Sequence, residues 1–349
     1  MGTAPERPRD AVVVVGGGLA GVLVALALIR RGLAVTLVAP ADEPAACPGS
    51  ATSLSYGAML GFGARRHWRH LEACHGPMGF APRGLVLHSW GGWLDQLPPA
   101  ALALLSAPLP VGQVDSARFA AALPGVLAAA GVNQLDARVL NLQPRPGGGW
   151  ILRLAGLDPS PSASLESSRV VLAAGAFCRS LWPALTPNLR HSWAGALIVT
   201  DLADGNPWLE QVRSGRVVQP RAWRRPALEA RSAALTQEAW IVDAGLAPWG
   251  SGALLGQITL VPAGPAGLEP PDPAQMEQRL RQGLARLDPA LARLDGDYRQ
   301  VPVAFCADGR PLVGPVAAAP GLWSFAGFSG PFGTAPALAE QLAADLAAA

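Results

Sequence analysis

The chain of 349 residues carries 27 basic and 25 acidic side chains, which gives a formal net charge of +2, and 50% of its residues are hydrophobic. This composition supports a large buried core, in one large domain or two modest ones. No run of like charges occurs, which excludes the electrostatic footprint of a nucleic-acid-binding protein. All of the basic residues are arginines, so a Schiff-base lysine and a P-loop lysine are excluded too.

The cysteines and histidines predict neither a disulfide framework nor a metal site. The four cysteines are widely spaced and form no Cys-x-x-Cys pair, so we expect a reducing compartment such as the cytoplasm. His67, His70, Cys74 and His75 lie at helical spacing, but no second cluster accompanies them. We interpret them as part of a surface-facing helix and expect no bound metal.

The chain begins with the order strand, glycine turn, helix, strand. Val12–Val15 is a β-branched run typical of a strand buried on both faces of a parallel sheet. A helical segment follows at Val22–Arg31, ends at Gly32, and leads into a second predicted strand at Ala34–Val38. Residues 11–29 contain no charged residue, but this internal order argues against a membrane span or a signal peptide.

The turn between the first strand and the helix reads GGGLAG at residues 16–21, which fits the dinucleotide-binding pattern G-x-G-x-x-G. Gly16 permits a tight turn, Gly18 lets backbone N–H groups approach a pyrophosphate, and Gly21 allows the helix to pack closely on the strand. The helix N-terminus would then face the phosphates. The acidic residue that normally binds the ribose is replaced by Ala39, and Asp42 or Glu43 could reach back from the following loop.

Three later segments carry motifs rich in small residues and glycine. Residues 170–176 read VVLAAGA, and residues 50–61 read SATSLSYGAMLG. The third segment comprises DGRPLVGP at 308–315 and AGFSGPFGT at 326–334. Together these segments resemble the FAD-dependent oxidoreductases of the D-amino-acid oxidase, glycine oxidase and sarcosine oxidase superfamily.

This resemblance implies FAD, bound without a covalent link, although Cys306 is an alternative attachment point. The loop over residues 50–61 would cover the flavin ring with Met59 on the substrate side, unless it is an ordinary surface loop with Met59 in the core. The cofactor-binding residues that the resemblance and the glycine motif imply are Gly16, Gly18, Leu19, Ala20, Gly21, Ala39, Ser53, Met59, Val139, Ala174, Gly175, Gly327, Gly330, Phe332, Gly333 and Thr334.

The resemblance also implies a fold. We expect an α/β protein in which a Rossmann-like, discontinuous FAD-binding domain comprises residues 1–80, 111–190 and 300–349. A substrate domain with a mixed or antiparallel sheet would comprise residues 81–110 and 191–299, with the flavin between the two domains. Within the substrate domain the sequence predicts strands at 240–243 and 254–260 and a helix at 273–287.

The end of the chain predicts a helix that points at the flavin. Ala335–Ala348 is rich in alanine and leucine, Pro336 would lie in its first turn, and Thr334 is the expected N-cap. Unpaired backbone N–H groups at this helix start would stabilise the negative charge of the reduced flavin.

Both arginines that bind the substrate carboxylate in glycine oxidase are missing here, because Val303 and Gly330 occupy the corresponding positions. Either another arginine enters the pocket, or the substrate is not a simple amino acid. The predicted catalytic residues are Met59, Arg299 and Arg310, and the further candidates for the arginine are Arg224 and Arg225.

The function implied is oxidation of a small amine or amino acid to an imine, by hydride transfer to flavin N5. O2 or another acceptor would reoxidise the flavin. Because the chain contains no lysine, a lysine-assisted reaction with O2, as in sarcosine oxidase relatives, is excluded. The alternatives are a dehydrogenase of the same fold that uses an acceptor other than O2, and a flavin-binding protein without amino-acid turnover.

Overall fold

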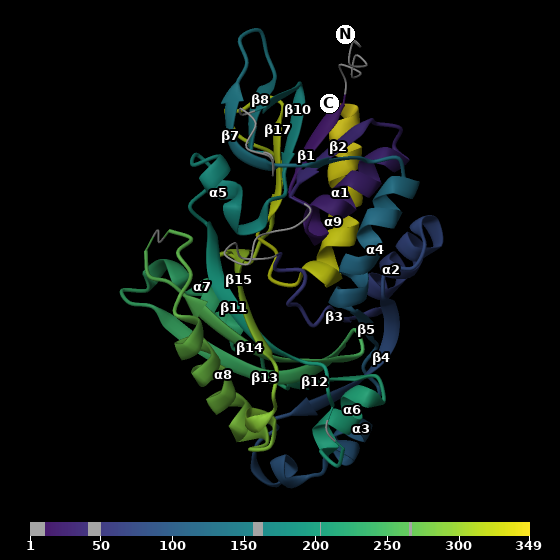
Figure 1. Cartoon of the computed structure of the whole chain (residues 1–349), viewed down its shortest axis with the longest axis vertical. Helices are drawn as coiled ribbons and strands as arrows, with labels where there is room; N and C mark the ends of the chain where they lie inside the picture. Colours follow the sequence, from purple (N-terminus) through teal and green to yellow (C-terminus); the bar gives the residue numbers. More distant parts are fainter. Residues whose placement is uncertain (1–10, 41–49, 156–162, 203, 265–266) are drawn as a thin grey trace.

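The structure is a computed structural model, which describes residues 11–40, 50–155, 163–202, 204–264 and 267–349. Figure 1 shows two larger sheets at opposite ends of the long axis, with helices packed on the outer side of each. Three hydrogen-bonded sheets of six, eight and three strands make up the described β structure.

The six-stranded sheet is built from segments at the start, middle and end of the sequence. Its strands, in spatial order, are β16 (Leu312–Pro315), β17 (Leu322–Ala326), β10 (Arg169–Leu172), β1 (Val12–Val15), β2 (Val35–Ala39) and β6 (Asn133–Asp136). The central strand β1 pairs in parallel with both β10 and β2, and all four of its valines are buried. The prediction of a doubly buried parallel strand is therefore confirmed.

Helices cover one face of this sheet and a small sheet covers the other. The helices are α1 (Leu19–Arg30), α2 (Phe62–His75), α4 (Ser116–Ala129) and α9 (Pro331–Ala348), and α1 and α9 lie side by side. The opposite face packs against α5 (Cys178–Leu181) and the three strands β7 (Arg138–Pro144), β8 (Trp150–Ala155) and β9 (Ala163–Ser167). α1 begins three residues earlier than the sequence predicts, because Gly18 serves as its N-cap.

The eight-stranded sheet is mixed, as expected of the substrate side. Its order is β15 (Asp297–Cys306), β11 (Leu189–Val199), β14 (Gly252–Val261), β13 (Ala239–Trp249), β12 (Arg216–Pro220), β4 (Phe80–His88), β5 (Val111–Val114) and β3 (Ala58–Leu60). Only the β12–β4 pair is parallel. β3, β5 and most of β15 belong to this sheet although they lie in the ranges expected for the FAD-binding domain, and the boundaries stay a prediction.

The remaining helices flank this sheet. They are α3 (Pro99–Ser106), α6 (Pro207–Arg213), α7 (Arg225–Ala230) and α8 (Pro273–Leu287), with short 3₁₀ turns at Gly92–Gln96, Gly175–Phe177, Ser232–Ala234 and Leu291–Arg293. The helix predicted at 273–287 is confirmed, and its buried residues Met276, Leu280 and Leu284 recur every four residues. Among the described helices, none is both long enough and apolar enough to traverse a bilayer.

The start of α9 corrects one prediction. Thr334 is not the N-cap, because the helix begins at Pro331 and the hydroxyl of Thr334 donates to the carbonyl of Gly330 from within the first turn. Because the helix begins at Pro331, Pro336 lies inside it. Proline has no N–H, so Pro336 cannot donate the usual helical hydrogen bond to the carbonyl of Phe332. The buried indole of Trp68 donates to that carbonyl instead, at 2.7 Å. A side chain from α2 thus satisfies the acceptor that Pro336 leaves free.

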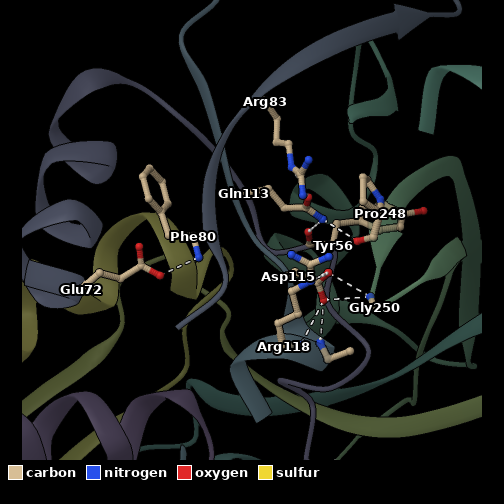
Figure 2. Close-up of polar contacts among 10 residues, drawn as sticks. Tyr56, Glu72, Phe80, Arg83, Gln113, Asp115, Arg118, Pro248 and Gly250 are labelled. Atoms are coloured by element: carbon tan, nitrogen blue, oxygen red, sulfur yellow. Dashed lines mark hydrogen bonds and ion pairs between the residues drawn. The ribbon is translucent and has the colours of Figure 1, made fainter. Parts of the chain in front are cut away.

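A buried polar network links the start of α4, one of the helices on the six-stranded sheet, to the β13–β14 hairpin of the eight-stranded sheet (Figure 2). The carboxylate of Asp115, 1% exposed, caps α4 by accepting hydrogen bonds from the N–H groups of Ala117 and Arg118. It also accepts the N–H of Gly250, at 2.9 Å, in the turn between β13 and β14. Beside it, the buried amide of Gln113 donates to the carbonyls of Tyr56 and Pro248. The N-terminus of α4 is thereby linked to the β13–β14 hairpin of the eight-stranded sheet.

We expect Asp115→Ala to lower the free energy of unfolding by about 2–4 kcal/mol, because three backbone N–H groups lose a charged acceptor that is itself buried. The matched control is Asp272→Ala, which removes an exposed cap that accepts only from Ala274. Asp272→Ala should lower the free energy of unfolding by about 1 kcal/mol. Urea unfolding followed by circular dichroism measures both variants, and equal losses would contradict the role of Asp115 between the sheets.

Candidate functional site

A cavity of about 740 Å³ lies where the two larger sheets meet. One end is lined by the carboxyl ends of β1 and β2 and by the turns that follow them. The other end is lined by Gln219 of β12, Gln257 of β14 and Val303 of β15. The edge of a parallel sheet at its strands' carboxyl ends is the place where this architecture binds dinucleotides.

The glycine turn brings backbone and small polar groups closely together at the start of α1. Gly16 has φ +115°, and a Cβ at Gly21 would collide with the Gly16 carbonyl oxygen, so helix and strand pack at backbone distance. A Cβ at Gly18 would lie 3.0 Å from the hydroxyl oxygen of Ser50 and 3.4 Å from that of Thr52. Thr52 also accepts the N–H of Leu19 at 2.9 Å. Two hydroxyls and a helix N-terminus therefore surround one cradle.

The ribose and adenine end contains no described carboxylate at the usual position. Ala39 lines the cavity, and its methyl group lies 2.7 Å from where a Cβ of Gly17 would be. Asp42 and Glu43, the proposed substitutes, lie outside the described residues. Val139, another predicted cofactor-binding residue, also lines the cavity.

Most of the predicted cofactor residues meet in this cavity. Those that line it are Gly16, Gly18, Leu19, Ala20, Ala39, Val139, Ala174, Gly175, Gly327, Gly330 and Phe332. Those that do not are Gly21, Ser53, Met59, Gly333 and Thr334. The polar residues that line it and that the sequence did not single out are Ser50, Thr52, Ser55, Tyr56, Arg138, Ser180, Gln219, Gln257 and Ser329.

Met59 lies in the core rather than over the cavity. Its side chain is 4% exposed and packs among the buried residues of α1, α2 and α9. Its neighbours Gly57 and Ala58 line the cavity instead. Of the two interpretations of this loop, the packing supports the core methionine.

Cys306 lies behind the cavity wall. A Cβ at Gly327, which has φ +81°, would collide with its sulfur, so the chain turns closely over the thiol. Burial, and then the carboxylate of Asp308, raise the pKa of Cys306 to about 11. A thiol that stays protonated and does not line the cavity is unsuited to hold a flavin covalently.

The four candidate arginines lie in different places. Arg299 is 63% exposed and pairs with Asp297, and Arg310 is also exposed. Arg224 is 57% exposed and pairs with Asp243. None of these three lines the cavity. Arg299 and Arg310, predicted as catalytic residues, therefore extend to solvent outside the cavity, and their catalytic role stays a prediction.

Arg225 is the candidate that enters the cavity, at the start of α7. Its Nε donates to Glu229 at 2.6 Å, and its Nη1 contacts the amide oxygen of Gln257 at 3.5 Å. Glu229 is 2% exposed, and its second oxygen accepts the hydroxyl of Ser329 at 2.8 Å. The i, i+4 spacing of Arg225 and Glu229, with Pro226 in the first turn, is the sequence signal that marks this pair.

The phenol of Tyr56 forms part of the same wall. A Cβ at Gly245 would lie 3.2 Å from its oxygen, so the ring rests where β13 has no side chain. Burial, and then the carboxylate of Asp243, raise the pKa of Tyr56 well above its usual value of 10.0. Tyr56 therefore stays neutral and adds no charge to the cavity wall near Arg225.

Comparisons with known proteins agree with this geometry. The structure is similar to L-amino acid deaminase from Proteus vulgaris, with a TM-score of 0.67, 15% identity, and coverage of 100% of this chain and 96% of the other. It is also similar to glycine oxidase from Geobacillus kaustophilus, with a TM-score of 0.66 and 18% identity, over 97% of this chain and 94% of the other. For iminodiacetate oxidase from Chelativorans sp. BNC1 the TM-score is 0.64 and the identity 16%, over 96% of this chain and 95% of the other.

A comparison of the sequence with curated proteins finds no significant match. The family model described as "FAD dependent oxidoreductase" matches residues 11–345, which is nearly the whole sequence. The glycine cradle at residues 16–21 and the cavity beyond it fit the cofactor that this description names. The chain therefore belongs to the family of FAD-dependent oxidoreductases.

Proposed function

We propose that this protein oxidises a small amino acid or amine that carries a carboxylate, giving an imine that water then hydrolyses. The observation that carries the proposal is Arg225, an arginine in the wall of the cavity beyond the glycine cradle. The names of three similar structures, a glycine oxidase, an L-amino acid deaminase and an iminodiacetate oxidase, support the same substrate class.

FAD would supply the hydride acceptor, and the residues that hold it follow from the cradle. The N-terminus of α1, the hydroxyls of Ser50 and Thr52, and the exposed backbone at Gly18 suit the pyrophosphate. Phe332 and Gly330, at the start of α9, suit the flavin end. In this proposal residues 1–80, 111–190 and 300–349 form the FAD-binding domain, and residues 81–110 and 191–299 form the substrate domain.

Arg225 is held so that one edge of its guanidinium is available to a ligand. Its Nε is engaged by Glu229 and its Nη1 only weakly by Gln257, and Nη2 makes no hydrogen bond to a described residue. A carboxylate accepts two parallel hydrogen bonds from such an edge. This arginine would do what the arginines absent from positions 303 and 330 do in glycine oxidase.

The rest of the wall restricts water near the reacting carbon. Pro302, Val303 and Phe328 line the cavity with apolar groups. An apolar wall beside a fixed carboxylate anchor limits the orientations of the substrate, and orientation is the main contribution a protein makes to hydride transfer. No ionised acid or base is needed at the α-carbon in this scheme.

A second candidate is a dehydrogenase that passes electrons to an acceptor other than O2. The observation that favours it is the complete absence of lysine from the chain, because no lysine ammonium is available to promote the reaction of O2. The substrate half of the reaction is the same in both cases.

Gly18→Ala should raise the dissociation constant of FAD about tenfold, because the new methyl group occupies the space beside Ser50 and Thr52. The control is Gly125→Ala, since a Cβ at Gly125 in α4 meets no atom within 4 Å. Fluorescence titration of the flavin-free protein with FAD measures both. Equal affinities of the two variants would rule out the pyrophosphate position assigned here.

Arg225→Leu should raise the amino-acid concentration that half-saturates flavin reduction about 30- to 150-fold, by removing ~2–3 kcal/mol of charge-assisted hydrogen bonding. The measurement is anaerobic bleaching of the flavin by amino acids, supplied first as a pool of glycine, sarcosine, D-amino acids and L-amino acids. Arg224→Leu is the control, because its exposed side chain does not line the cavity. If no amino acid bleaches the flavin of the wild type, the proposed function is wrong.

Reoxidation of the reduced protein separates the two candidates. If the lysine-free chain is a dehydrogenase, a soluble quinone will reoxidise its flavin faster than air-saturated buffer does. Stopped-flow absorbance at the flavin band measures both rates. Rapid reoxidation by O2 alone would assign the protein as an oxidase.

A further inference from the structure

We infer that Ser329 and Glu229 form the site for the substrate's amino group, so that the pocket selects the zwitterion of an α-amino acid over a simple carboxylic acid or a simple amine. This inference rests on the proposed function. It comes from a contact behind the cavity wall: the hydroxyl of Ser329, in the turn before α9, donates to Glu229 of α7 at 2.8 Å.

The hydrogen bond decides what the hydroxyl of Ser329 can offer to a ligand. A carboxylate only accepts, so the hydroxyl proton of Ser329 is committed to Glu229. Its two lone pairs remain, and Ser329 is an exposed residue that lines the cavity. A hydroxyl whose proton is committed is an acceptor toward the cavity, and an ammonium or amine N–H is the complementary donor.

Charge supports the same assignment. Arg225 and Glu229 form a nearly dry ion pair, with side chains 15% and 3% exposed. A zwitterion presents the opposite arrangement, with its carboxylate toward the arginine and its ammonium toward the group backed by the glutamate. A lone carboxylate would satisfy only half of this pair, and a lone amine only the other half.

The dimensions agree as well. The two oxygens of Glu229 belong to one carboxylate, and they contact Nε of Arg225 at 2.6 Å and Oγ of Ser329 at 2.8 Å. One side chain therefore fixes the anion-binding edge and the amine acceptor next to each other. The amino group and the carboxylate of an α-amino acid are separated by a single carbon, so both can be bound by neighbours of the same glutamate.

The roles of the two residues differ. Ser329 would contact the substrate, whereas Glu229 does not line the cavity and acts through Ser329 and Arg225 as a positioning residue. Ser329 follows Phe328 and precedes Gly330, both of which also line the cavity. An amino group at Ser329 would hold the α-carbon between the arginine and the flavin end.

The test compares two molecules of the same shape that the protein cannot oxidise. 2-Aminoisobutyrate has no α-hydrogen, and pivalate replaces its ammonium with a methyl group. Binding of each to the FAD-loaded protein is measured by calorimetry and by the shift in flavin absorbance. We expect the wild type to bind 2-aminoisobutyrate at least tenfold more tightly than pivalate, about 1.4 kcal/mol.

Ser329→Ala should abolish this preference and leave pivalate affinity within twofold of the wild type, whereas Arg225→Leu should weaken both ligands. Glu229→Gln should also reduce the preference, because the negative charge behind Ser329 that favours the ammonium is removed. Ser232→Ala is the control, because this buried serine lies beside α7 but does not line the cavity. An unchanged preference in Ser329→Ala, or no preference in the wild type, overturns the inference. Bleaching of the flavin by amino acids would show in either case that the proposed function survives.

Discussion

The carboxylate of Asp115 is the contact on which the geometry of the cavity depends. The walls of the cavity belong to different sheets, built from segments far apart in the sequence, so their separation must be fixed by contacts between the sheets. Asp115 supplies one by capping α4 and binding Gly250 at the tip of the opposite hairpin. A buried charge with three backbone donors is costly to break, so the two sheets are held in one arrangement.

The same network places the loop that covers the cradle. Ser116, the residue after Asp115, donates to the carbonyls of Ser53 and Ser55, and the indole of Trp249 also donates to Ser53. These contacts explain why Ser53, predicted to bind the cofactor, does not line the cavity. Its backbone anchors the loop, and Ser50 and Thr52 reach the cradle instead.

The parts of the fold with strong local patterns could be predicted from the sequence. The strand at 12–15, the glycine turn and the helix at 273–287 each depend on spacing that a few residues carry. The order of the eight strands in the large sheet could not be predicted, because its pairings join residues that are distant in sequence. Helix α9 began earlier than expected because a tryptophan from another helix satisfies the carbonyl that Pro336 leaves free.

The candidate site also has a part that could be predicted from the sequence and a part that could not. The spacing of the glycines predicts the dinucleotide-binding turn, because close backbone packing there requires glycine at each position. An arginine gives no such signal, since its long side chain can reach a pocket from almost any helix or strand. Arg225 was one of four candidates, and only burial and its pairing with Glu229 distinguish it from Arg224 beside it. No local pattern predicts the contact between Glu229 and Ser329, since one hundred residues separate them.

The packing of α1 against α9 has a consequence for how the protein is made. α1 ends at Arg30 and its covering helix begins at Pro331, so at ribosomal rates of 5–20 residues per second the first helix waits ~15–60 s for its partner. During that time the nascent chain exposes a helix that is almost entirely apolar. The cavity also needs residues 325–332, so it is complete only after nearly the whole chain has been translated.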